Sequence, residues 1–101
     1  MNKITMTGGK IGGLAITIDG DPVRHIERHS PDGMQVGYAG SGPADCARSI
    51  LIHMTSQETA DRLYQQFKRE IVAGWKHPGG TTHQEIDIIA WIEKALKRID
   101  K

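Results

Sequence analysis

Cysteine and aromatic residues are scarce in this chain. Cys46 is the only cysteine, so no disulfide can form within one molecule, which fits a reducing compartment. Aromatic residues make up 5% of the sequence, so we expect a core built mainly from aliphatic side chains. No apolar run has the length of a signal peptide or a membrane-spanning helix. We therefore expect a cytoplasmic protein.

The chain also lacks an excess of basic or of acidic residues. Thirteen basic residues stand against 12 acidic residues, for a net charge of +1. Proteins that bind nucleic acid by neutralising phosphates usually carry a basic excess or stripe. Charge therefore gives no support to nucleic-acid binding. That option would regain support if the basic residues of the second expected helix shared one face with Lys10 or Arg24.

The composition that remains is typical of one globular domain. The chain has 101 residues, of which 38% are hydrophobic and 25% are charged. We therefore expect residues 1–101 to form a single domain.

The first 40 residues show the alternation of β-strands, interrupted by glycine-rich turns. Asp19-Gly20 favours a tight hairpin turn, and the Pro31-Asp32-Gly33 segment predicts a second turn. We expect strands at about residues 3–7, 14–18, 22–27 and 34–38.

The apolar spacing changes to that of helices after Pro43, a residue that suits the first turn of a helix. Capping boxes at Thr55/Glu58 and Thr82/Glu85 predict two further helix starts. We expect helices at about residues 43–54, 56–73 and 83–98. Strands that precede helices indicate the α+β class, with a four-stranded antiparallel β-meander packed against three helices. Leu63, Phe67 and Ile71 should pack against the apolar face that includes Ile16 and Val36.

The segment from His29 to Pro43 contains His-Ser-Pro-Asp-Gly, then Gly-Tyr, then Gly-Ser-Gly-Pro. This pattern resembles the HSPxG…GYxGSGP signature of an uncharacterised family of bacteria and their phages, labelled domain of unknown function 6166. The resemblance implies a fold and a mobile-element context. It implies no activity.

The Gly40-Ser41-Gly42 corner admits two interpretations. It precedes an expected helix, and free N–H groups at a helix N-terminus attract anions, so Gly40, Ser41 and Gly42 are a candidate anion or ligand site. The alternative is structural, with Ser41 or Gly42 capping the helix and glycine adopting positive φ in a tight corner. The full phosphate-loop and dinucleotide patterns are missing.

Catalytic and metal-binding signatures are missing as well. His25 and His29 lie four residues apart where an expected strand runs into a turn. Strand spacing would separate them by about 13 Å, which is too far for joint chelation without a bend. Cys46 lies next to the apolar stripe of the first expected helix, which favours buried packing over nucleophilic chemistry. No serine stands in a nucleophile-elbow pattern. We therefore expect no enzyme activity, no catalytic residue, no bound metal and no cofactor.

The polar side of the second expected helix is a candidate partner-binding face, with a solvated surface as the alternative. Its residues are Arg62, Gln65, Gln66, Lys68 and Arg69.

Two functions follow as hypotheses. The first is a small non-enzymatic accessory protein of a phage or mobile element that binds a host protein, in one form as an anti-CRISPR-like inhibitor of host defence. The second is a nucleotide- or phosphate-binding module that uses the Gly-Ser-Gly-Pro helix N-terminus. The sequence does not name the target or the oligomeric state.

Overall fold

The computed structural model describes residues 1–9 and 13–99 and shows the expected α+β architecture, with four antiparallel strands in one sheet and three α-helices. The strands are β1 (Asn2–Gly8), β2 (Leu14–Ile18), β3 (Asp21–Val23) and β4 (Thr81–Ile86). The helices are α1 (Ser41–Met54), α2 (Gln57–Glu70), the short 3₁₀ helix η1 (Val72–Gly74), and α3 (Ile88–Ile99). The prediction for Lys10 falls outside the described residues.

The first three strands form the expected consecutive hairpins. β1 pairs with β2, and β2 pairs with β3, both antiparallel. Asp19 and Gly20 connect β2 to β3 with φ angles of 51° and 88°, the two positive values that a type I′ hairpin turn requires. The Asp19 carboxylate also accepts hydrogen bonds from the Asn2 side chain and the Lys3 N–H, at 2.8 Å each. The turn is thereby fixed to the start of β1.

The fourth strand is not at residues 34–38, as the sequence predicted, but at Thr81–Ile86, and it pairs antiparallel with β1. The strand order is β3-β2-β1-β4, so the sheet is not a simple meander. Residues 34–38 form no ladder because their backbone groups bond to three separate elements. Leu14 N–H donates to Met34 O, Gln35 N–H donates to Gly42 O, and Gly37 N–H donates to Val72 O.

The predicted helix at residues 83–98 begins five residues later than expected, at Ile88. Thr82 and Glu85 matched a capping box by spacing, yet both lie in β4. The threonines suit a strand, and β1 offers a free edge on which the strand can pair. Asp87 starts the helix instead, because its side chain accepts a hydrogen bond from Ala90 N–H at 3.0 Å.

Two other boundaries also differ. The predicted strand at 22–27 ends at Val23, where the chain turns toward α1. The predicted helix at 56–73 ends at Glu70 and is followed by η1. Ser56, not Thr55, is the N-cap of α2, and its hydroxyl accepts the Thr59 N–H at 3.1 Å. The Thr55/Glu58 capping box is therefore displaced by one residue.

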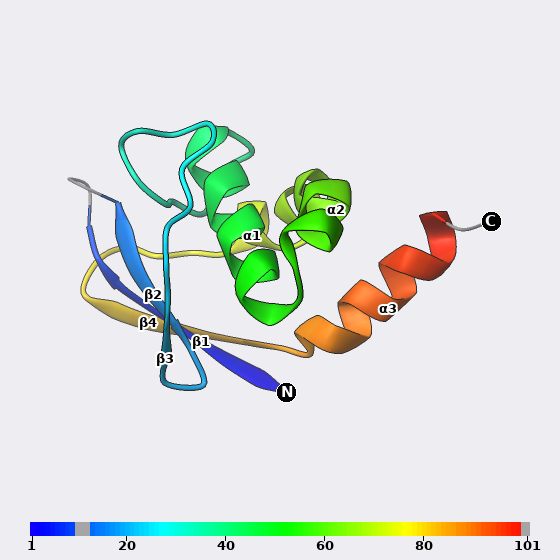
Figure 1. Ribbon diagram of the computed structural model, residues 1–101. Helices are drawn as coiled ribbons and strands as arrows, with labels where there is room; N and C mark the ends of the chain where they lie inside the picture. The colour runs from blue at the N-terminus through cyan, green and yellow to red at the C-terminus, as the bar shows by residue number, and fades with distance from the viewer. Residues whose placement is uncertain (10–12, 100–101) are drawn as a thin grey trace.

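The core lies between the sheet and α1 and α2, which stand over one face of the sheet (Figure 1). Ile16, Leu63 and Phe67 are buried in this one core, and Val36 and Ile71 pack against it. Val36, however, lies in the segment between β3 and α1 and not on the sheet face that the sequence predicted. The largest fully buried apolar side chains are Phe67, Ile4, Met6, Ile50, Leu51, Leu63, Ile88 and Val72.

α3 extends away from the sheet toward the C-terminus (Figure 1). Its contact with α2 is aromatic, with the Phe67 and Trp91 rings 4.8 Å apart in an edge-to-face arrangement. Trp91 Nε1 also donates to the Glu70 carboxylate at 3.1 Å. Over residues 1–9 and 13–99, every helix is too short or too polar to cross a lipid bilayer.

Candidate functional site

A long loop, residues 24–40, joins β3 to α1 and contains no helix or strand. It holds most of the His29–Pro43 signature. In Figure 1 it rises from β3 and passes around the upper end of α1. We call it the signature loop.

The Asp45 carboxylate, fully buried in the first half of α1, fixes the first part of the signature loop. It accepts hydrogen bonds from the backbone N–H groups of Arg28 at 3.2 Å, His29 at 2.9 Å and Ser30 at 2.9 Å. His25 Nε2 lies 2.9 Å from the same carboxylate. Four donors from the loop therefore converge on one buried acceptor.

These contacts also set the ionisation of Asp45. Burial raises the pKa of this carboxyl, but the hydrogen bonds from His25 and from the three backbone N–H groups outweigh burial and lower the pKa below its usual value. The carboxylate is therefore held in its charged form, in which it accepts all four hydrogen bonds.

The signature turn at residues 30–33 is closed by local bonds and close packing. Ser30 Oγ donates to Gly33 O at 2.9 Å, and Gly33 N–H donates to Ser30 O at 3.3 Å. The turn lies against the β1–β2 hairpin, because a Cβ added at Gly13 would lie 2.7 Å from Gly33 Cα. Gly13 has φ of +80°, so this approach requires glycine for both reasons.

The loop is also joined to α2 by two polar contacts. Asp61 accepts Arg48 Nε at 2.6 Å and Arg28 Nη1 at 3.3 Å. The hydrogen bond from Arg48 is the main reason that the pKa of Asp61 is lowered. His29 Nε2 lies 2.8 Å from the Tyr64 hydroxyl, and the two rings stack. The exposed side of the loop and one side of α2 thus form a continuous polar surface.

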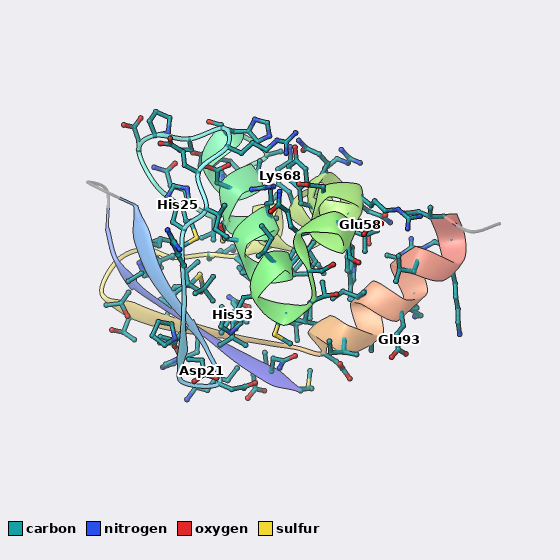
Figure 2. The ribbon with its side chains drawn as sticks, in the orientation of Figure 1. Asp21, His25, His53, Glu58, Lys68 and Glu93 are labelled. Atoms are coloured by element: carbon teal, nitrogen blue, oxygen red, sulfur yellow. The ribbon has the colours of Figure 1, made fainter. Side chains whose placement is uncertain are left out.

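The predicted partner-binding residues of α2 divide by helical spacing. Gln65 and Lys68 lie on the side of Asp61 and Tyr64, because residues three and four apart share a face. Lys68 lies in the upper part of Figure 2 with His25, on the side of the loop.

The other three predicted residues of α2 follow the next helical face. Gln66 Nε2 donates to the Glu70 carboxylate at 2.7 Å, and Glu70 also binds Trp91, so this face leads toward α3. Arg62 and Arg69 are exposed. By helical spacing, Gln65 and Lys68 are therefore the predicted residues on the face of α2 that contacts the signature loop through Asp61 and Tyr64.

The Gly40-Ser41-Gly42 corner differs from the expected structural arrangement. Gly40 is the N-cap with φ of −110°, and α1 begins at Ser41 with no side-chain cap hydrogen bond from any described residue. Neither Ser41 nor Gly42 caps the helix, and Gly40 and Gly42 do not adopt positive φ.

Close contacts explain these glycines instead. A Cβ at Gly42 would lie 2.7 Å from Gln35 Oε1 and 2.8 Å from Gln35 Cβ, and a Cβ at Gly40 would lie 2.5 Å from the Tyr38 ring. The Tyr38 hydroxyl also hydrogen-bonds to Gln35 Oε1. The corner therefore holds two loop side chains in place. Anion binding by Gly40, Ser41 and Gly42 stays a prediction.

Gln35 and Tyr38 also line a cavity of about 490 Å³, which the sequence did not predict. The cavity lies between the signature loop, the end of the β1–β2 hairpin and the segment before β4. Its lining residues are Gly8, Gly9, Leu14, Gln35, Val36, Tyr38, His77, Pro78, Gly79 and Gly80. The available signal was the pair of double glycines, Gly8-Gly9 and Gly79-Gly80, which lie far apart in the sequence.

His77 connects two walls of this cavity. Its Nε2 lies 2.8 Å from Gly8 O, and its Nδ1 lies 2.6 Å from Thr82 Oγ1. A carbonyl oxygen only accepts, so Nε2 carries the proton and Nδ1 can accept from the threonine hydroxyl. This pattern is satisfied by the neutral imidazole.

The other chemically notable side chains have structural surroundings. Cys46 is fully buried, and burial, with a smaller contribution from the Asp45 charge, raises the pKa of its thiol. His25 and His29 bind Asp45 and Tyr64 respectively, not a shared point. Within residues 1–9 and 13–99, no group of three or more His, Cys, Asp or Glu side chains is placed to hold a metal ion.

The most connected polar residues, Asp45 and Asp61, were missed in the sequence. A signal for Asp45 was present, because Asp45, Arg48 and Ser49 recur at helical spacing within an otherwise apolar segment. Ser49 also contacts the loop, since its hydroxyl accepts Ile26 N–H at 3.0 Å. This stripe marks the side of α1 that holds the signature loop.

Comparison with known proteins identifies one family. The profile of a "Family of unknown function (DUF6166)" matches residues 6–94 of this chain. A search of curated proteins and a search of solved structures each found no match. The matched range contains the signature loop, Asp45 and all of the named cavity-lining residues. The chain therefore belongs to the DUF6166 family.

Proposed function

We propose that this protein is a non-enzymatic binding module that recognises a partner protein through the signature loop and the adjoining side of α2. The observation that carries the proposal is the buried Asp45 carboxylate, which accepts four hydrogen bonds from residues 25–30 of the loop.

The length and order of the loop support this role. Loops longer than about 12–15 residues without secondary structure are uncommon in small domains and are usually either functional or disordered. This loop is held in place by Asp45, which favours a functional role. Ordering a chain segment is opposed by its conformational entropy. Because Asp45 holds this segment in one conformation before any partner arrives, binding would require little further ordering.

The side chains on this surface suit a polar interface. Glu27, Arg28 and Asp32 are exposed on the loop, and Arg28 keeps 49% of its side chain accessible while bound to Asp61. Charges of both signs beside the His29 and Tyr64 rings favour a partner with a complementary polar surface.

The family resemblance suggests the setting. Because it implies a phage or mobile-element context, we propose a host protein in the bacterial cytoplasm as the partner, and a component of a host defence system as one form of it. An anti-CRISPR-like inhibitor would act in this way, by occupying a host protein without chemical change.

Charge reversal on the loop tests the proposal. A Glu27→Lys/Asp32→Lys variant changes two exposed carboxylates of the loop, and a Glu85→Lys/Glu93→Lys variant makes the same change on β4 and α3. Each variant and the wild type would serve as bait in bacterial lysate, with quantitative mass spectrometry of the captured proteins. We expect the wild type and the β4/α3 variant to capture the same protein in similar amounts. The loop variant should capture at least tenfold less of it.

The α2 side is tested separately. Lys68→Glu should also weaken capture, whereas Lys97→Glu on α3 should not. Equal capture by all variants would rule out this surface. Capture of no protein by the wild type at micromolar bait would count against protein binding itself.

A further inference from the structure

The described residues that line the cavity beside the signature loop have little side-chain bulk and no carboxylate, ammonium or guanidinium group. Four of its lining residues are glycines, so a ligand can approach the backbone closely at Gly8, Gly9, Gly79 and Gly80. None of its described lining residues is Asp, Glu, Lys or Arg. Both ring nitrogens of His77 are already engaged, one with Gly8 O and one with Thr82 Oγ1. A charged group placed here would lose hydration without gaining a charged partner from the described walls.

The apolar part of the lining is suited to a flat group. Tyr38 contributes an aromatic ring whose other contacts include Gly40, and Leu14, Val36 and Pro78 add aliphatic surface. Planar rings stack on aromatic side chains, and stacking depends on the ring face more than on a particular base. Tyr38 is already held by Gly40 and by its hydrogen bond to Gln35, so it is positioned before a ligand binds.

The polar part of the lining is small and directional. Gln35 uses its Oε1 to accept the Tyr38 hydroxyl, and the same side chain carries an amide nitrogen. This nitrogen has two N–H donors, which fit a ring nitrogen or carbonyl acceptor at the edge of a heterocycle. Small-molecule sites commonly combine a largely apolar cavity of about 300–1,000 Å³ with a few such polar groups.

We propose that this cavity binds a neutral, planar nitrogen heterocycle of nucleoside size, stacked on Tyr38 and hydrogen-bonded to Gln35. The site is distinct from the anion site considered at Gly40–Gly42, because it recognises the uncharged ring and not a phosphate. It does not depend on the partner protein proposed above.

Titration with nucleosides tests this site. Adenosine, cytidine and uridine would be added to ¹⁵N-labelled protein, with their 5′-monophosphates and N-acetyltryptophanamide as comparison probes. We expect at least one nucleoside to shift the amide signals of residues 35–38 and 77–80, and its monophosphate to bind no more than threefold tighter. A monophosphate that binds more than tenfold tighter would overturn the neutral-ligand assignment. Binding of N-acetyltryptophanamide alone would overturn it in favour of a protein side chain.

Filling the cavity provides the second test. Gly9 lines the cavity, does not adopt positive φ, and has no atom within 4 Å of an added Cβ, so Gly9→Leu should fit without strain and occupy the ligand space. Gly74→Leu is the matched control, because Gly74 has the same open surroundings outside the cavity lining. We expect nucleoside affinity to fall at least tenfold in Gly9→Leu and to change less than twofold in Gly74→Leu, with both variants folded by circular dichroism. Unchanged nucleoside affinity in Gly9→Leu would overturn the proposal. So would the absence of any signal shift with a nucleoside at about 5 mM, a concentration high enough to detect millimolar binding.

Discussion

The two parts of the signature loop are fixed by different physical means. Residues 25–30 are held by hydrogen bonds to the buried Asp45 carboxylate. The part around Gln35 and Tyr38 has backbone hydrogen bonds to Leu14, Gly42 and Val72. Its side chains are held by shape, because they lie where a Cβ would project from Gly42 and Gly40. The first part therefore depends on a charge, and the second depends on the absence of side chains.

The difference predicts different responses to mutation and to pH. Removing a charged acceptor leaves several donors unsatisfied at once, whereas adding a small group to a crowded corner displaces one neighbour. Protonation acts on a carboxylate and leaves steric contacts unchanged. Substitutions in each part of the loop therefore test which interaction holds that part in place.

The largest effect should follow Asp45→Ala. The loss of a buried carboxylate that accepts four hydrogen bonds should lower the free energy of unfolding by about 3–5 kcal/mol. Urea denaturation would measure it. Asp32→Ala is the control, since Asp32 is exposed on the same loop and should change stability by less than about 0.5 kcal/mol. Equal losses from the two variants would show that Asp45 does not fix the loop.

Acid should remove part of the same contribution. The folded pKa of Asp45 is lowered, so its ionised form stabilises the fold at pH values above the unfolded pKa, about 3.9. That stability should be lost as the pH falls below about 4 and through the folded pKa. Asp19, Asp61 and Glu70 also have lowered pKa values and add to the wild-type acid response. Asp45→Asn retains those groups, so its unfolding free energy should fall less steeply than that of the wild type between pH 5 and 3, a window around the ordinary Asp pKa. Parallel pH profiles would contradict the role of Asp45.

Gly42→Val should have an intermediate effect. Its Cβ would lie within 3.0 Å of three Gln35 atoms, one of them Gln35 Cβ close to the backbone. Such overpacking costs about 1–3 kcal/mol. Gly74→Val places the same side chain in open space and is the control for the intrinsic effect of valine. If thermal melting shows the two variants to be equally stable, Gln35 moves aside easily and shape does not fix this part of the loop.

The sequence predicted those regions whose structure depends on neighbours in the chain. The Asp19-Gly20 hairpin and the apolar stripe of α2 are local patterns, and both are confirmed. The strand predicted at 34–38 is wrong because its alternation of apolar residues does not reveal that its backbone bonds go to Leu14, Gly42 and Val72. β4 was missed because its pairing depends on β1, about 80 residues earlier in the chain.

The residues of the candidate site also divide into those that a local sequence pattern reveals and those whose role depends on the fold. Glycines at residues 40 and 42 were visible in the sequence, but the expected reason, positive φ, is wrong. The reason is the close approach of the Tyr38 and Gln35 side chains, which depends on the path of a loop without regular structure. The role of Asp45 required knowing that its helix face meets the loop. The presence of an aspartate in the sequence does not show which element that side chain will contact.

The contact between Tyr38 and Gly40 should appear as energetic coupling. Gly40→Ala displaces the Tyr38 ring, whose atoms lie 2.5 and 2.9 Å from the added Cβ. In a Tyr38→Ala background the same substitution meets no ring and should be less destabilising by about 1 kcal/mol. A double-mutant cycle measured by urea denaturation gives this difference and cancels the intrinsic preference for glycine at an N-cap. Additive effects would show that the ring does not depend on Gly40.

Ser41→Ala should have the smallest effect and separates the structural from the ligand-binding interpretation of the corner. Ser41 is exposed, and α1 has no side-chain cap hydrogen bond from the described residues, so stability should change by less than about 0.5 kcal/mol. Ser56→Ala is the matched control, because Ser56 caps α2 through Thr59 N–H and its loss should cost about 1 kcal/mol. Melting temperatures of both variants, with phosphate affinity measured by calorimetry, decide the outcome. If Ser41→Ala keeps its stability but loses phosphate binding that the wild type and Ser56→Ala retain, the hydroxyl is a ligand. If Ser41→Ala is as destabilising as Ser56→Ala, the Ser41 hydroxyl caps α1. The corner would then be held by a side-chain hydrogen bond as well as by shape.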